Sequence, residues 1–150
     1  MKKIIPALFL MCFLFSFSGI AQKKTGPIKP KISTTLNGIR DSSVITVDDA
    51  IKFIAMPISI LDDKKGVYRI SSYMFMYVRK GVTEDEATGK VSPITSNVSA
   101  IFKTTPLSPI WIKTIQEQVK PGEELFFVDI IVKDGAGKLF YAPTLRLLVK

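Results

Sequence analysis

The sequence has 150 residues and carries 21 Lys and Arg against 13 Asp and Glu, which gives a formal net charge of +8. It contains no histidine, and its one cysteine is Cys12. Nucleophile–histidine pairs and ordinary zinc sites therefore lack the residues that they need.

The first 21 residues have the pattern of a cleavable secretory signal peptide. Lys2 and Lys3 precede an apolar run over 4–17, and Gly19 and Ala21 are the small residues before a cut after residue 21. The apolar run is shorter than the roughly 18 residues expected of a membrane-spanning helix, although an uncleaved anchor is the alternative. We expect a periplasmic protein, or else a secreted or cell-surface one, with no stable membrane span after cleavage.

Residues 22–37 are predicted to be a flexible linker, and residues 38–150 a single domain. The stretch over 22–31 has prolines, a glycine and no apolar period. The remaining length is common for one domain. Because a cut after Ala21 removes Cys12, the domain is expected to depend on packing, without an internal disulfide.

The first half of this domain is predicted to hold one helix and two strands. Thr46 is a suitable N-cap for a short helix, with Asp48 and Asp49 in its first turn. Strands are predicted over 56–61 and 67–79, because the charged stretch between them ends in Gly66 and is typical of a turn.

The strand over 67–79 alternates between two sets of side chains. The more apolar set is expected to face the core, and it consists of Tyr68, Ile70, Ser72, Met74, Met76 and Val78. The opposite set brings Tyr73, Phe75 and Tyr77 together, either as a second buried face or as an exposed strip that contacts a partner. Burial is the favoured interpretation, and the contact strip is the functional one.

The segment over 80–93 is predicted to be a long solvated loop, because it holds Gly81, Gly89, Pro93 and acids from Glu84 to Glu86. A short strand over 98–102 follows. A second helix is then predicted, with Ser108 as its N-cap and Pro109 at its first position. Its apolar stripe is Ile112, Ile115 and Val119, and Lys120-Pro121-Gly122 ends it.

The last part of the chain is predicted to form two strands around the turn over 134–137. The strand over 125–133 is a near-continuous apolar run, which favours burial on both faces. Within it, Asp129 is expected to be hydrogen-bonded or exposed at a sheet rim. The strand over 138–149 is expected to be an edge or to have a bulge at Pro143, since proline cannot donate to the ladder. Together these elements predict a mostly β domain: an immunoglobulin-like antiparallel β-sandwich with one or two short helices.

The sequence offers little material for catalysis or for a cofactor. The acid pairs Asp48-Asp49 and Asp62-Asp63 and the run Glu84–Glu86 lie at predicted caps, turns or loops, where solvation explains them. No glycine-rich phosphate motif occurs, and the lysines and arginines are scattered, without the clustered stripe of a nucleic-acid interface. We therefore expect a protein that is not an enzyme and that binds no cofactor, metal or nucleic acid.

From about Gly38 to Lys150, the order of features resembles the C-terminal domain of the GldM/PorM family, the periplasmic shaft proteins of Bacteroidetes gliding motility and type IX secretion. The most specific parts are the stretches over 119–123 and 125–130, the glycine turn at Gly135 and Gly137, and the closing strand. The stretches over 45–48 and 68–73 are also similar to that family. The resemblance implies an immunoglobulin-like envelope domain that docks to other proteins, with no catalytic residue.

These observations predict an exported, non-catalytic protein-interaction module of the bacterial cell envelope, which the resemblance associates with gliding motility or type IX secretion. Its expected partners are envelope proteins, and a homo-oligomer is left open. The contact surface would be the Tyr73, Phe75 and Tyr77 strip or the edge strand with Pro143. The alternative is a carbohydrate- or peptidoglycan-binding module that uses Trp111, Tyr141 and the loop acids, and a hydrolase that uses carboxylates alone ranks third.

Overall fold

A computed structural model describes residues 30–150, so the predicted signal peptide and the linker up to residue 29 lie outside the described residues. Strands and helices follow in this order: β1 (Ile32–Leu36), β2 (Ser43–Ile45), α1 (Val47–Phe53), β3 (Ile58–Asp62), β4 (Arg69–Glu84), β5 (Val91–Phe102), α2 (Pro109–Gln118), β6 (Glu124–Lys133), β7 (Leu139–Ala142) and β8 (Leu145–Val149). The linker prediction over 22–37 is wrong for its last part, because β1 pairs antiparallel with β3.

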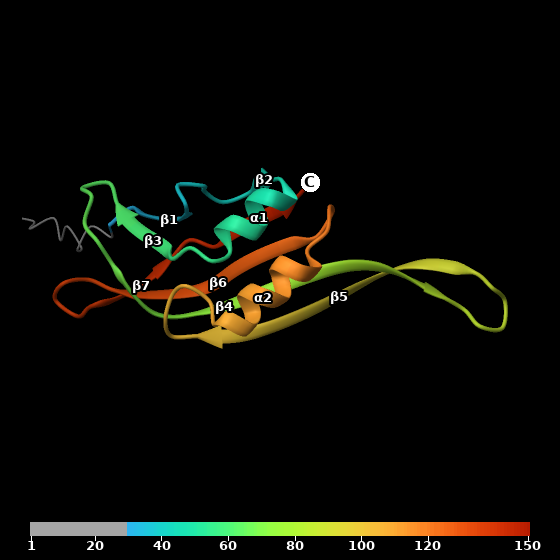
Figure 1. Cartoon of the computed structure of the whole chain (residues 1–150). Coiled ribbons are helices and arrows are strands. Elements are labelled where there is room, and N and C mark those ends of the chain that lie inside the picture. Colours follow the sequence, from blue (N-terminus) through green and yellow to red (C-terminus); the bar gives the residue numbers. More distant parts are fainter. Residues whose placement is uncertain (1–29) are drawn as a thin grey trace, which may run out of the picture.

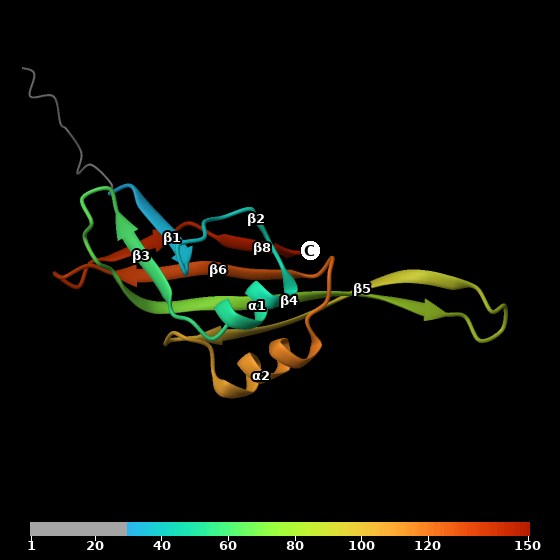
Figure 2. The same cartoon turned by 45° about the horizontal axis from the view of Figure 1, so that its top comes forward.

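The strands form one large sheet and one small sheet. The large sheet has the order β2-β8-β6-β4-β5, with β7 also beside β6, and only the β2–β8 pair is parallel. The small sheet contains β1 and β3. Among residues 30–150, strands hold 51% of the residues and helices 14%, which confirms a mostly β, sandwich-like single domain with two short helices. The second layer consists of the small sheet and both helices, which lie over one face of the large sheet (Figures 1 and 2).

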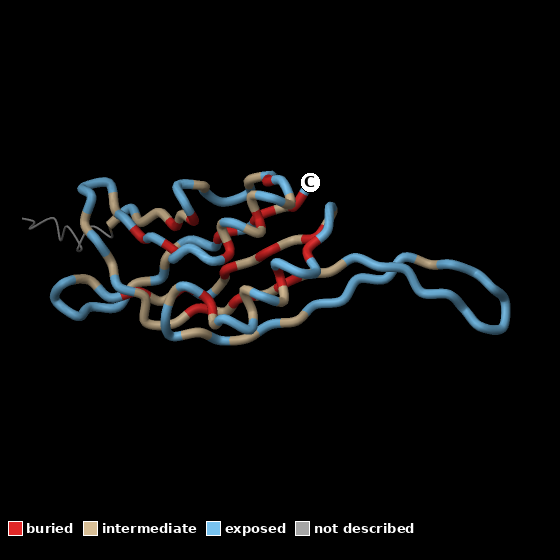
Figure 3. The backbone as a smooth tube through the Cα atoms, viewed as in Figure 1, coloured by how far each residue is buried: buried red, intermediate tan, exposed pale blue. Residues whose placement is uncertain are grey.

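The core lies between these two layers. The large sheet contributes Tyr73, Phe75 and Tyr77 of β4 and Phe127 of β6, all at most 2% exposed. The second layer contributes buried side chains from all of its elements, namely Leu36, Ala50, Ile54, Ile58, Ile60 and Ile115. Buried residues accordingly gather in one half of the molecule (Figure 3).

The predicted core face of β4 is correct at its start and wrong afterwards. Tyr68 and Ile70 pack against the core as predicted, whereas Met74, Met76 and Val78 are only half-buried and lie on the opposite face. The pairing with β6 shows the cause: from Ile70 to Ser72, β4 advances by two residues while β6 advances by one. This extra residue is a β-bulge, which reverses the alternation for the rest of the strand.

A second bulge, in β6, restores the pairing. Between the pairs Ser72–Ile131 and Met74–Val128, β6 supplies the extra residue, and Asp129 has the left-handed φ of 50°. Asp129 is exposed, as predicted, but it lies at a bulge in an interior strand and not at a sheet rim. The burial of β6 on both faces is a wrong prediction, because Phe126, Val128 and Ile131 are half-buried and only the opposite side chains reach the core.

Both predicted helices are present, and local chemistry explains where they begin. The Thr46 hydroxyl accepts a 3.1 Å hydrogen bond from the Asp49 N–H, as an N-cap should. Ser108 is the N-cap residue of α2, but its side chain makes no capping hydrogen bond, and only its carbonyl accepts from Trp111 and Ile112. Pro109 occupies the first position of α2, where a backbone N–H would have no partner within the helix, so the N–H that proline lacks is not missed.

The predicted closing strand is divided at Pro143 into β7 and β8. β7 pairs with β6 alone, whereas β8 lies between β6 and β2. The Pro143 carbonyl accepts a 2.6 Å hydrogen bond from the Thr34 hydroxyl of the second layer. Of the two segments that Pro143 separates, only β7 is therefore an edge.

The largest difference from the sequence prediction lies in residues 80–93. Most of this segment belongs to β4 and β5, which continue as a hairpin from Lys80 paired with Thr95 to Glu84 paired with Val91. The hairpin extends well beyond the packed part of the domain (Figure 1). The prediction of a long loop is wrong, although the segment is solvated throughout.

Candidate interaction surface

The projecting part of the β4–β5 hairpin, residues 79–96, is called the arm below. Pairing between β4 and β6 ends at Val78 and Glu124, so beyond that point β4 and β5 pair only with each other. The arm is almost entirely exposed (Figure 3). Beyond its base, and among residues 30–150, it is a two-stranded ribbon with two free edges and two uncovered faces.

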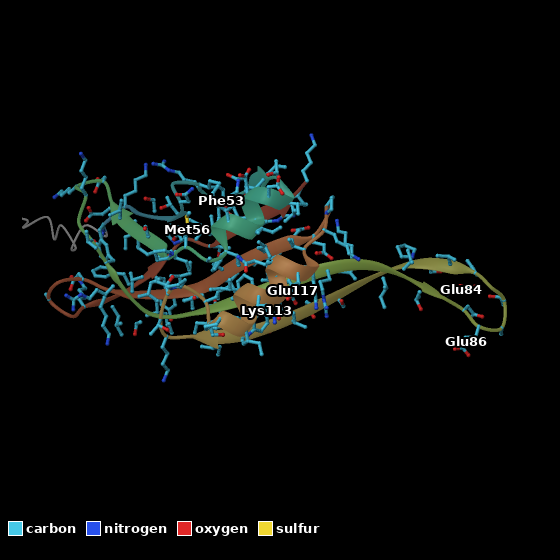
Figure 4. The ribbon with its side chains drawn as sticks, viewed as in Figure 1. Phe53, Met56, Glu84, Glu86, Lys113 and Glu117 are labelled. Atoms are coloured by element: carbon cyan, nitrogen blue, oxygen red, sulfur yellow. The ribbon has the colours of Figure 1, made fainter. Side chains whose placement is uncertain are left out.

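The tip of the arm is an ordered turn built around Asp85. Its carboxylate accepts hydrogen bonds from the Ala87 and Thr88 N–H groups at 3.0 and 2.9 Å, and from the Thr88 hydroxyl. These bonds, those from Thr88 first, hold the pKa of Asp85 below its usual value. Glu84 and Glu86 flank it at the far end of the molecule (Figure 4). The acidic run is therefore explained by turn formation and solvation.

The arm exposes apolar side chains on both faces. Val82 is 72% exposed, Val91 58% and Ile94 49%. Residues directly opposite each other share a face, so Val82, Pro93 and Val91 lie on one face and Ile94 on the other. An isolated two-stranded hairpin is marginally stable in water. Another molecule that covered these apolar side chains would therefore stabilise the arm.

Where the arm joins the body, two adjoining hollows form a groove beside α2. One hollow has a volume of about 400 Å³ and the other about 420 Å³, and both are lined by Arg79 and Gln118. Trp111, Thr114 and Gln118 of α2 form the wall, at the three- and four-residue spacing of one helix face. The floor consists of residues of β4 and β5: Tyr77, Arg79, Gly81, Ile94, Ser96 and Val98.

Arg79 is the charged residue at the centre of this groove. Its guanidinium lies 5.9 Å from the centroid of the Tyr77 ring, and its Nη1 donates a long 3.4 Å hydrogen bond to Gln118. Its Nε is buried and has no hydrogen-bond partner among residues 30–150. A buried donor without an acceptor is costly, so the Arg79 guanidinium is incompletely satisfied within residues 30–150, and an acceptor from another molecule would be favourable at this group.

Glu123 lines the same groove but is already engaged. It is 3% exposed, and its carboxylate accepts hydrogen bonds from the Tyr77 hydroxyl and from the Lys120 N–H. Burial, together with the nearby Glu123 carboxylate, raises the pKa of Tyr77 well above its ordinary value. These bonds tie the loop after α2 to β4 and fix one end of the groove.

The predicted contact strip of Tyr73, Phe75 and Tyr77 is not a surface of this domain. All three side chains are at most 1% exposed. Tyr73 stacks on Phe102 at 5.5 Å, and Phe75 meets the edge of Trp111 at 5.5 Å. Burial raises the pKa of Tyr73 to about 12. The contact-strip prediction is therefore wrong, and the favoured interpretation, a buried face beneath a helix, is confirmed.

The residues considered for sugar binding are not brought together. Trp111 packs its ring against Phe75 and Phe102 on the covered face of the large sheet. Tyr141 is 78% exposed and lies between Phe140 and Ala142, which both face the core, so it points to the opposite face. The two rings cannot form one stacking platform.

The acidic residues are likewise dispersed. Asp48 and Asp49 lie in the first turn of α1, and Asp62 accepts hydrogen bonds from the Gly66 and Lys64 N–H groups in the turn after β3. In the part of the chain that the structure describes, no three His, Cys, Asp or Glu side chains are grouped as a metal site would require. The helices among residues 30–150 are also too short or too polar to cross a membrane.

The arm and the groove were not predicted from the sequence. A signal for the arm was present, because β-branched residues at Val82-Thr83 and over 91–95 flank a turn-forming stretch that ends in Gly89. The groove had no such signal. It depends on where α2 packs against β4 and β5, which no local pattern specifies.

The other face of the large sheet is uncovered among residues 30–150. Met74, Met76, Phe126 and Val128 lie there and are half-buried by their neighbours. Arg146 lies across this face, with its guanidinium 5.6 Å from the Phe126 ring centroid and its Nε 2.7 Å from Glu124. The long side chains of the sheet itself thus shield part of its apolar surface.

Comparison with known proteins identifies no relative. No protein-family model matches the chain, and no curated protein matches it.

Proposed function

We propose that this chain is an exported, non-catalytic protein-interaction module of the bacterial cell envelope, and that the arm carries its contact with an envelope protein. The observation behind the proposal is the projecting hairpin, which exposes Val82, Val91 and Ile94 on a ribbon with free edges. Free strand edges and exposed apolar side chains are the two features that strand addition and protein docking use.

The position of the arm supports this role. β4 is one continuous strand from Arg69 to Glu84, and its first half is anchored by pairing with β6 and by the buried ring of Phe75. The arm therefore leaves the body in a direction that the core determines. A contact element held in this way loses less conformational entropy on binding than a flexible loop would.

The resemblance to the GldM/PorM C-terminal domain supports the proposed setting in gliding motility or type IX secretion. The residues that carry it most specifically, over 119–130, form the C-cap of α2, the following loop and most of β6. These are the segments that hold Glu123 and close one end of the groove. The export signal over 1–21 supports the envelope location.

Site-specific photo-cross-linking in the native envelope tests this proposal. A photoreactive phenylalanine analogue would replace Val82 or Val91, and the matched control would place it at Val67, which is 74% exposed on the body. We expect a discrete cross-linked protein from the arm positions and none, or far less, from position 67. Equal labelling from all three positions, or none from the arm, contradicts the proposal.

A further inference from the structure

We propose that the groove between α2 and the base of the arm binds an extended peptide segment of the partner, with an apolar side chain at one end and a carboxylate at the other. This inference rests on the proposed function, since it specifies the chemistry of the partner. It concerns the base of the arm, where Ile94 lines the groove, whereas Val82 and Val91 lie farther out.

The shape of the groove favours an extended ligand. Its floor follows the strands, from Tyr77 to Arg79 to Gly81 along β4 and from Val98 to Ile94 along β5. A strand rises about 3.3 Å per residue, so this floor has room for roughly four extended residues.

One end of the groove is apolar. Val98, Ile110 and Trp111 line it, and Ile110 is 73% exposed although it lies beside the indole of Trp111. An aliphatic or aromatic side chain placed there would remove apolar surface of both molecules from water.

The other end of the groove is cationic. Arg79, Lys80 and Lys120 line it, and none of them has a salt bridge among residues 30–150. Of the two acids at this end, Glu123 is occupied by the Tyr77 hydroxyl and the Lys120 N–H, and Glu117 forms a pair with Lys113. The three cations outnumber the two acids at this end, so its net charge is positive, which complements a carboxylate.

The guanidinium of Arg79 adds a specific point of recognition. Within the described chain its Nη1 makes only a long 3.4 Å hydrogen bond to Gln118 and its Nε has no acceptor, and arginine binds carboxylates through paired N–H donors. An Asp or Glu side chain, or a chain-terminal carboxylate, would supply the acceptor. The ligand is thus an apolar side chain followed, two or three extended residues later, by a carboxylate.

Peptide selection tests this inference. A phage-displayed library of random heptapeptides would be selected on the purified exported protein, and one enriched sequence would be synthesised. We expect enrichment of an aliphatic or aromatic residue followed within about three positions by Asp, Glu or the C-terminus. Trp111 is the one tryptophan of the chain, so binding should shift its fluorescence emission, because an apolar side chain would displace water from its ring.

Changes on both molecules then identify the contact. Replacing the acid of the peptide by its amide is expected to weaken binding about tenfold or more, the range for a charge-assisted hydrogen bond. Arg79→Gln should have a similar effect, whereas the matched Arg69→Gln, exposed at the start of β4, should have none. The amide peptide tests the inference even if Arg79→Gln fails to fold.

Three results would overturn the inference: selected peptides without an acid, unchanged Trp111 emission on binding, or equal affinity for the acid and amide peptides. Self-association through the groove, detected as loss of peptide binding in a dimer, would also overturn it, because a second copy would then be the occupant. Arm cross-links can persist in each of these cases, so failure here is distinguishable from failure of the proposed function.

Discussion

The two halves of β4 are one strand in two environments. From Tyr73 to Tyr77 it has a neighbour on each edge and a second layer over one face, and every second side chain is buried. From Lys80 to Glu84 it has one neighbour and no covering layer, and every side chain is exposed. In the first half, the alternating side chains pack into the core. In the second half, the side chains do not contribute to the core and are available to contact another molecule.

The largest effect is expected in the anchored half. Phe75→Ala should lower the free energy of unfolding by about 3–5 kcal/mol, because it leaves a cavity where the ring meets Trp111 and Phe127. Urea unfolding followed by circular dichroism measures it. Val82→Ala in the arm is the matched control and should change stability by less than about 0.5 kcal/mol. Similar losses in both variants would contradict the division of β4.

The anchored half should also make the protein sensitive to alkali. Burial raises the pKa of Tyr73 to about 12, whereas an unfolded tyrosine ionises near 10. Below about pH 9 both states keep the proton and stability is unaffected. Between about pH 10 and pH 12 only the unfolded state releases it, so stability falls as pH rises. Urea midpoints at pH 8, 10 and 11 should show this decline, with a shallower slope in Tyr73→Phe.

The point where the two halves meet depends on a buried polar pair. Tyr77→Phe removes the hydroxyl that donates to the buried Glu123 carboxylate, which is expected to cost about 1–3 kcal/mol. Thermal unfolding measures the loss. The double variant with Glu123→Gln should lose less than the two single variants together, because the unsatisfied charge is then absent. Additive losses would show that the pair is not coupled.

A smaller effect is expected at the bulge that sets the faces of the sheet. Asp129 has φ of 50°, a conformation that β-branched residues rarely adopt. Asp129→Val should therefore cost about 1 kcal/mol, whereas Asp129→Gly should be neutral or slightly stabilising. Chemical unfolding of both variants tests this. A stable Val variant would mean that the sheet can pair without this bulge.

The smallest change in stability is expected from removing the arm. Deleting residues 82–93 and joining Gly81 to Ile94 through Asn-Gly preserves a hairpin and leaves the core untouched. The free energy of unfolding should change by less than about 0.5 kcal/mol, while the cross-linked partner disappears. A large loss of stability would show that the arm supports the body.

Local patterns predicted what local chemistry determines. Three features depend only on neighbours within a few residues, and the structure has each of them where the sequence predicts it. They are the N-cap Thr46, the turn from Asp62 to Gly66, and Pro109 at the start of α2. The prediction of the core face of β4 is wrong beyond Ile70, because a bulge there reverses the alternation of its side chains. That bulge is defined by the pairing of β4 with β6, a strand some sixty residues later in the sequence.

The interaction surface was the least predictable part. Arg79 has no sequence pattern that distinguishes it from the other scattered cations. Its significance comes from the Tyr77 ring beneath it and the α2 wall beside it, which the fold brings together. The sequence of the arm favours a loop, because the turn residues at its tip outweigh the β-branched residues on either side.

The parallel pairing of β2 with β8 has a consequence for biogenesis. Arg146 N–H donates to Asp41, 105 positions earlier, and Leu145, Leu147 and Val149 of β8, the strand between β2 and β6, are buried in the core. A chain still emerging from the ribosome cannot complete this sheet until β8 has been made. Such distant contacts form slowly, so the large sheet closes late in folding.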